Sequence, residues 1–173
     1  QGARKMFQQF DKLALDHPQA RTVWLGLLAR APETLLNSGL SGHMPDQVHY
    51  LRRPETGLMM LQARTGGQGE RFNLGEITVT RCAVRIDDAP EHASVGIAYI
   101  TGRSHRRAQL AAVADALLQN PATHPALSRQ LLDPVRDYLQ RRRDQQWQRS
   151  QTTRVDFLTM TRESDNGEGE DAA

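Results

Sequence analysis

The densest group of residues that could bind a ligand is a glycine-rich polar segment from Arg64 to Arg71, Arg-Thr-Gly-Gly-Gln-Gly-Glu-Arg. Its glycines permit backbone angles that are denied to other residues, so main-chain N–H groups there can approach an anion. A nucleotide-binding loop, however, leads from a strand into a helix, whose N-terminus stabilises the phosphate charge. Here the flanking sequence predicts a strand on both sides. We therefore favour a tight hairpin turn with exposed charges, and anion binding is the alternative.

Two further arginines lie on the strand that is predicted after this turn. Arg81 and Arg85 lie an even number of residues from Val79, and side chains alternate between the two faces of a strand. The two arginines are therefore expected on the same face as Val79, which is otherwise apolar. Charged groups on such a face need acidic partners. Glu70 and Glu76 are candidates within the chain. The pattern favours salt bridges, within the protein or at an interface, over direct catalysis.

A third basic group surrounds a predicted helix N-terminus. Ser104 is a suitable N-cap, and Arg103, Arg106 and Arg107 lie on either side of it. The helix dipole disfavours positive charge at this end. Either an anion or an acidic surface binds there, or the arginines extend into water at a small energetic cost that solvent screening reduces.

Residues for independent catalysis are scarce. The only lysines are Lys5 and Lys12, which argues against a phosphate-binding lysine loop, a Schiff-base enzyme or a kinase. The six histidines are scattered without metal-ligand spacing, and one cysteine cannot build a disulfide or a four-thiolate zinc site. Cys82, on a strand with apolar neighbours, is expected to be a small buried hydrophobe. We therefore assign no catalytic residue and expect no metal or cofactor in this chain.

The candidate anion-binding or interface residues are Arg64, Gly66, Gly67, Gly69, Glu70, Arg71, Arg81, Arg85 and Arg103.

These residues are positioned by a predicted α+β fold. The middle of the chain predicts an antiparallel sheet, with strands near Gln47–Arg53, Gly57–Arg64, Glu76–Ile86 and Val95–Thr101. A last strand is expected around Val155, Phe157 and Leu158, which makes about five. Helices are expected on the N-terminal side, up to Pro32, and between the fourth and last strands. The second helical region begins after Ser104 and is interrupted by a cap or kink at Asp133–Pro134.

Length and charge predict one domain with two extensions. The 173 residues suffice for a single compact domain. We place it at residues 18–162, after an amphipathic helical extension at 1–17 and before an acidic, disordered tail at 163–173. The net charge is +2, but five of the 20 acids lie in the tail, so residues 1–162 carry 22 minus 15, or +7. No apolar run could span a membrane and no secretory signal is seen, which predicts a cytoplasmic protein.

A basic domain raises the alternative of a nucleic-acid-binding module. Aromatic residues make up only 5% of the chain, and no predicted strand carries paired aromatics for base stacking. Nucleic acid is therefore not the expected partner.

The string Glu-Thr-Gly-Leu-Met-Met-Leu-Gln-Ala-Arg-Thr-Gly-Gly-Gln-Gly-Glu-Arg within Glu55–Arg85 resembles the G subunit of the bacterial carbon-phosphorus lyase core complex. The resemblance spans Arg21–Arg162, with further support from Gly96–Leu118 and Arg154–Met160. The residues that match the family's recurrent motif are Glu55, Thr56, Gly57, Gln62, Arg64, Gly66, Gly67, Gly69, Glu70, Arg71, Phe72, Gly75, Arg81, Arg85, Gly102, Arg103, Asp115 and Asp156.

The resemblance implies a subunit that is not active alone. With the H, I and L subunits it would take part in the transfer of a phosphonate to ribose C1′ of ATP, which releases adenine and gives α-D-ribose 1-methylphosphonate 5-triphosphate. The core would contain G, H, I and J subunits, with nucleosidase chemistry attributed to I and radical cleavage to J. ATP and the phosphonate would thus be substrates of the complex, and this chain would shape or position the I subunit.

Overall fold

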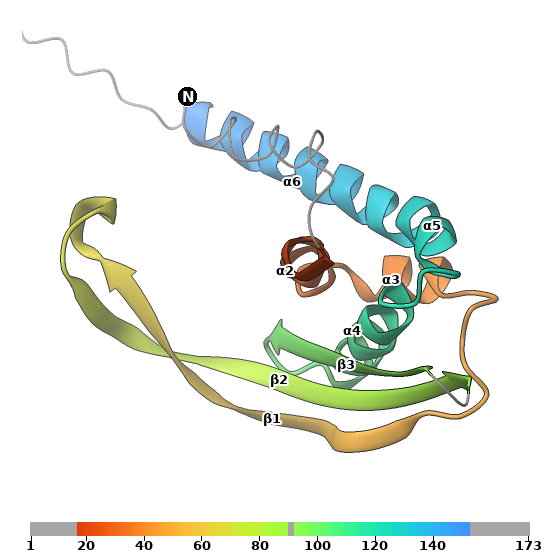
Figure 1. Ribbon diagram of the computed structural model, residues 1–173. Helices are drawn as coiled ribbons and strands as arrows, with labels where there is room; N and C mark the ends of the chain where they lie inside the picture. The colour runs from red at the N-terminus through yellow and green to blue at the C-terminus, as the bar shows by residue number, and fades with distance from the viewer. Residues whose placement is uncertain (1–16, 90–91, 153–173) are drawn as a thin grey trace, which may run out of the picture.

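The computed structural model describes residues 17–89 and 92–152, which form an α+β fold (Figure 1). In chain order the elements are α2 (His17–Leu28), α3 (Glu33–Gly39), β1 (His49–Arg64), a 3₁₀ turn (Thr65–Gly67), β2 (Arg71–Ala89), β3 (His92–Thr101), α4 (His105–Leu118), α5 (His124–Leu127), a π-helical turn (Ser128–Leu132) and α6 (Asp133–Thr152). The predicted fold class is confirmed.

Within the described residues the sheet has three antiparallel strands in the order β1-β2-β3, where four were predicted. The two strands predicted on either side of Pro54 are one strand, β1. Proline lacks an N–H group, but β1 is an edge strand, where one unpaired position is tolerated. Register shifts between Tyr50 and Glu55 accommodate the irregularity.

Other expectations fall outside the described residues. These are the last strand at 155–158, the acidic tail at 163–173 and the helical extension at 1–17, of which only His17, the first residue of α2, is described.

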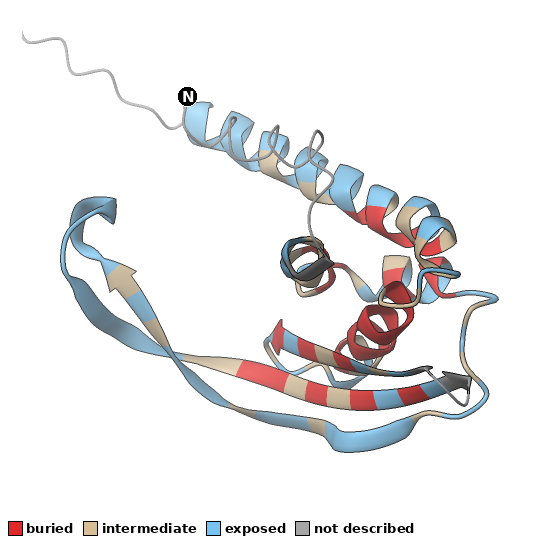
Figure 2. Ribbon diagram, viewed as in Figure 1, coloured by how far each residue is buried: buried red, intermediate tan, exposed pale blue. Residues whose placement is uncertain are grey.

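Helix α4 covers one face of the sheet (Figures 1 and 2). Its alanine-rich sequence is buried along most of its length. Gly96 of β3 allows this close packing, because a Cβ there would lie 2.6 Å from the main-chain nitrogen of Ala116. On β2, Val84 and Ile86 alternate toward the core, and α2, α3 and the start of α6 complete it.

The helix boundaries in the second half of the chain lie largely where the sequence predicted them. Ser104 is the N-cap of α4, as predicted, although its side chain makes no capping hydrogen bond. The predicted interruption near Pro134 is the π-helical turn that joins α5 to α6. None of the described helices combines the length and the apolar character that crossing a membrane requires.

The first two strands extend well beyond the rest of the body. We call residues 57–78 the arm: β1 from Gly57, the turn, and β2 as far as Thr78. Because the register between β2 and β3 begins at Val79, the two strands of the arm pair with each other along almost their whole length. Figure 1 shows the arm as a twisted ribbon that extends beyond the part of the sheet covered by helices.

Candidate functional site

The tip of the arm is a tight turn made by glycines. Gly66 and Gly67 have φ angles of 58° and 84°, in the left-handed region that favours glycine. The N–H of Gly69 donates to the carbonyl of Thr65 at 2.8 Å, and a Cβ on Gly69 would lie 2.7 Å from that same oxygen. The hairpin interpretation of this segment is confirmed.

The charges at the tip face solvent. Arg64 and Arg71 are directly opposite in the register, an arrangement that costs energy unless something neutralises it. Arg64 Nη1 donates to the carbonyl of Gly69 at 3.2 Å. The Arg71 side chain has no hydrogen bond or ion pair with any described residue. The tip can therefore offer guanidinium groups to an acidic or anionic partner.

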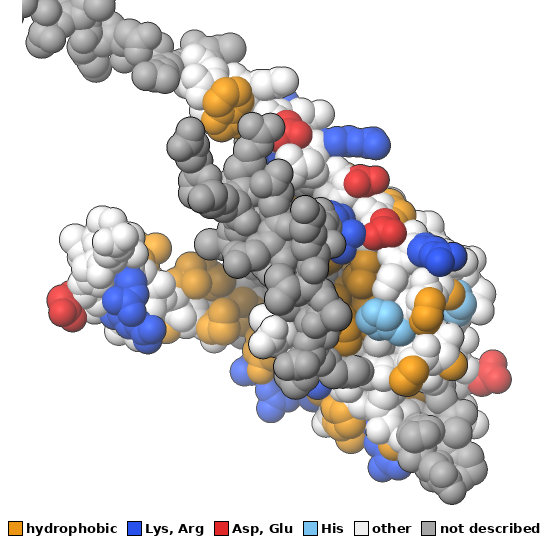
Figure 3. All heavy atoms as spheres, turned by 45° about the horizontal axis from the view of Figure 1, so that its top comes forward, with side chains coloured by type: hydrophobic (Ala, Val, Ile, Leu, Met, Phe, Trp, Pro, Cys, Tyr) orange, Lys and Arg blue, Asp and Glu red, His pale blue; other side chains and the backbone are white. Residues whose placement is uncertain are grey.

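The stem of the arm exposes large apolar side chains. Leu58 and Leu74 are 63% and 62% exposed, and Met59, Met60 and Phe72 between 40% and 46%. Figure 3 shows hydrophobic side chains along the stem between the charged tip and the body. An isolated two-stranded ribbon is marginally stable in water, and contiguous exposed apolar surface is typical of interaction sites. The arm is thus the main candidate interaction surface.

Arg81 and Arg85 form salt bridges within the chain, as favoured from the sequence, but not with Glu70 or Glu76. Arg81 Nη2 lies 2.9 Å from Glu55 Oε1, and Arg85 Nε lies 2.8 Å from Asp87 Oδ1. The expected partners were wrong because Glu70 lies at the tip and Glu76 on the stem of the arm. Both arginine side chains lie near the surface, so these pairs contribute little to stability.

A polar cluster joins the sheet to the start of α4. The buried Thr80 hydroxyl donates to the carbonyl of Gly102 at 2.7 Å and accepts the N–H of Ser104 at 3.2 Å. The Thr56 hydroxyl lies 3.2 Å from it and 3.1 Å from His105 Nε2. This cluster fixes the turn that carries Arg103.

The three arginines around this helix N-terminus have different roles. Arg107 Nε donates to the carbonyl of Ala31, just after α2, and Arg106 Nη2 donates to Asn37 Oδ1. Arg103 is exposed, and its side chain has no hydrogen bond or ion pair with any described residue. The predicted cluster therefore contains two structural arginines and one that is available to a partner.

The predicted site residues do not form one site. Six lie at the tip, two in the middle of the sheet, and Arg103 beyond the end of β3. From Arg71 to Arg81 the strand rises by roughly 33 Å. No single small ligand can contact the whole set, whereas a protein partner lying along the sheet can.

One structural centre was given no role from the sequence, although its residue, Asp115, matches the family's recurrent motif. Asp115 of α4 is fully buried and accepts hydrogen bonds from Arg21 Nη2 at 2.8 Å, Trp24 Nε1 at 2.8 Å and the main-chain N–H of Ile97 at 2.9 Å. It therefore ties α2, α4 and β3 together. An acid inside an apolar helical stripe was the available signal, since a buried carboxylate requires partners.

Groups that could catalyse a reaction are placed unfavourably. Burial raises the pKa of the Cys82 thiol from 9.0 to about 11, so it is not an activated nucleophile. His124 Nδ1 lies 2.7 Å from the carbonyl of Leu118, and His43 Nε2 lies 3.1 Å from Gln130 Oε1. In the part of the chain that the structure describes, no three His, Cys, Asp or Glu residues are grouped to hold a metal ion.

Comparison with known proteins finds a matching family and a similar curated protein. Residues 19–163 match the family described as phosphonate metabolism protein PhnG. A curated protein of Rhizobium meliloti (strain 1021), α-D-ribose 1-methylphosphonate 5-triphosphate synthase subunit PhnG, is 40% identical over 142 residues. The match covers 80% of this chain and 86% of that protein.

Proposed function

The chain belongs to the PhnG family of phosphonate metabolism proteins, and from this we propose that it is the PhnG subunit of an α-D-ribose 1-methylphosphonate 5-triphosphate synthase. The observation that carries the proposal beyond family membership is the arm, which exposes Leu58, Leu74 and three more large apolar side chains. Such a surface suits a subunit whose folded form is completed by its neighbours.

The proposed reaction of the complex is a substitution at ribose C1′ of ATP. A phosphonate oxygen forms a bond to C1′ while the bond from C1′ to N9 of adenine breaks. The bonding electron pair leaves with adenine, which takes up a proton. Consistent with the resemblance, the H, I and L subunits would be the functional partners and J would join the core. Because ATP is the substrate, the complex would operate in the cytoplasm.

This chain would position rather than catalyse. The buried thiol of Cys82 and the internally bonded His43 and His124 support that role. Either Arg64 and Arg71 at the tip or Arg103 before α4 would complete an anion-binding wall against a neighbouring subunit, because Arg81 and Arg85 already pair with acids. A wall of this kind would favour attack by phosphonate over attack by water.

The experiment is product analysis by phosphorus NMR. The H, I and L subunits are incubated with ATP and methylphosphonate, with and without this chain, and the chain is also tested alone. We expect ribose 1-methylphosphonate 5-triphosphate only in the complete mixture and no consumption of ATP by the chain alone. Equal phosphonate transfer without the chain, or turnover by the chain alone, would refute the proposal.

A further inference from the structure

The two edges of the sheet differ in their ability to accept another strand. The outer edge of β1 contains Pro54, which has no N–H group, and the register shifts between Tyr50 and Glu55. Such features protect an edge from pairing. The pairing of β3 with β2 is regular from Val95 to Thr101, so β3 presents a regular outer edge.

Hydrogen bonds show which groups of β3 point outward. Ile97 donates its N–H to Asp115 rather than to β2, whereas Gly102, the residue after the strand, donates to the carbonyl of Thr78. In an antiparallel pair these directions alternate from residue to residue. The main-chain groups of Ile97, Tyr99 and Thr101 therefore point away from β2.

The described residues close only half of this edge. The carbonyl of Val95 accepts Arg21 Nη2 at 3.0 Å and Gln119 Nε2 at 2.8 Å, and the N–H of Ile97 is bound by Asp115. Farther along, no side chain of a described residue donates to the carbonyl of Ile97 or bonds to the N–H or carbonyl of Tyr99. A further strand would supply an N–H group for the carbonyl of Ile97, and a carbonyl and an N–H group for the N–H and carbonyl of Tyr99.

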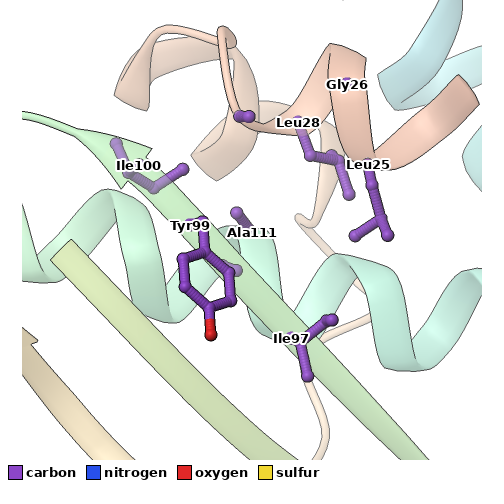
Figure 4. Close-up of a pocket in the computed structure, with 9 residues that line it drawn as sticks. Leu25, Gly26, Leu28, Ile97, Tyr99, Ile100 and Ala111 are labelled. Carbon is purple, nitrogen blue, oxygen red and sulfur yellow. The ribbon is translucent and has the colours of Figure 1, made fainter. Parts of the chain in front are cut away.

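A small apolar cavity lies directly beside the open half of the edge. It measures about 270 Å³ and lies between α2 and β3, where Leu25, Gly26, Ala29, Ile97 and Tyr99 contribute to its walls (Figure 4). This is smaller than the usual small-molecule site of about 300–1,000 Å³. It suits one or two apolar side chains that an extended segment would direct toward the body.

We propose that the open edge of β3 and this cavity bind an extended, apolar segment of another subunit of the synthase complex, which adds a fourth strand beside Tyr99. The inference rests on the proposed function, because it requires a partner subunit. We assign the occupant to another subunit because the similar curated protein is a subunit of a synthase.

Amide hydrogen exchange tests the pairing. In the isolated chain the Tyr99 and Thr101 amides should exchange rapidly, and in the assembled complex at least about 100-fold more slowly, because a partner carbonyl then accepts them. Unchanged exchange at both amides in a complex that does assemble would overturn the inference. Failure of the chain to join any complex would instead refute the proposed function.

A matched pair of variants tests the cavity. A Cβ at Gly26 would have only Arg30 Nη2 nearby, at 3.6 Å, so a side chain fits without a clash. Gly26→Met should fill the cavity, keep or raise the melting temperature because glycine disfavours helices, and lower the affinity for the complex at least tenfold. Gly26→Ala should change that affinity by less than threefold. Equal affinities for both variants would contradict the inference.

Photocrosslinking identifies the occupant. Tyr99 is 50% exposed, so a benzophenone amino acid can replace it. Crosslinks from position 99 to a different subunit would support the inference. Crosslinks to a second copy of this chain, or to its own N- or C-terminal residues, would overturn it.

Discussion

At the scale of single residues, Asp115 has the largest organising effect. One carboxylate satisfies a guanidinium, an indole N–H and a main-chain N–H from α2 and β3. Its exposed fraction is 0%, whereas the Arg21 side chain is 31% exposed. The carboxylate is therefore held at fixed distances from both elements, and these distances also set the spacing between α2 and the edge of β3.

We predict that Asp115→Asn destabilises the fold by roughly 2–4 kcal/mol. Asparagine retains one acceptor oxygen but places an NH₂ group against donors, and it leaves Arg21 without its charge partner. Urea denaturation of the two proteins measures the difference in the free energy of unfolding. Asp137→Asn on the exposed surface of α6 is the control and should cost less than about 0.5 kcal/mol. A cost below about 1 kcal/mol for Asp115→Asn would contradict the organising role.

Residue types predicted chemistry better than they predicted partners. That Arg81 and Arg85 need acids followed from the cost of burying charge. That the acids are Glu55 and Asp87 could not follow, because the partner of Arg81 is set by the register between β1 and β2. Cys82 was assigned correctly as a buried apolar residue, because alternation along a strand requires no knowledge of its neighbours.

At the scale of elements, the arm is the main departure from the sequence prediction. Pro54 ended a predicted strand, since proline interrupts pairing in a central strand. The position of β1 at the edge of the sheet is a property of the tertiary structure, and only that position makes proline acceptable. The glycine turn at the tip was predicted, because its requirement for positive φ is local. The length of the arm was not, because β1 continues without interruption from the body to the tip.

We predict that Leu58→Ser on the arm weakens assembly at least tenfold without unfolding the chain. Burial of one leucine contributes about 1.5–3 kcal/mol, and about 1.4 kcal/mol corresponds to a factor of ten in affinity. Leu58 is 63% exposed in the isolated chain, so the melting temperature should change little. Titration of the labelled chain into the remaining subunits measures the affinity.

Leu51→Ser is the matched control for this prediction. Leu51 lies on the same strand, is 60% exposed and lies outside the arm. Its replacement should change the affinity less than threefold. Similar losses for the two variants would show that the arm has no special part in assembly.

At the scale of the whole molecule, the candidate residues make sense as parts of an extended interface rather than of a catalytic pocket. The tip, the middle of the sheet and the turn before α4 were predicted from charge and glycine content, each by a local argument. Their separation could not be predicted, because it depends on how far the paired strands continue beyond β3. The open edge of β3 was equally hidden, since a strand pattern does not show which neighbours a strand lacks.

The charge distribution predicts how the whole chain behaves toward nucleic acid. Residues 163–173 carry five acids and no base, so their removal changes the net charge from +2 to +7. A basic protein gains nonspecific affinity for polyanions, and this affinity falls steeply with salt because counterions are released.

We therefore expect the chain that ends at Arg162 to bind generic duplex DNA more tightly than the full chain at 50 mM salt and to lose that binding by 200 mM. Assembly with the other subunits should be unchanged, because a segment with this acidic, apolar-poor composition is not expected to pack in a core. Fluorescence anisotropy with labelled DNA at both salt concentrations gives the measurement. DNA binding by the full chain that resists 200 mM salt would favour the nucleic-acid-binding alternative instead.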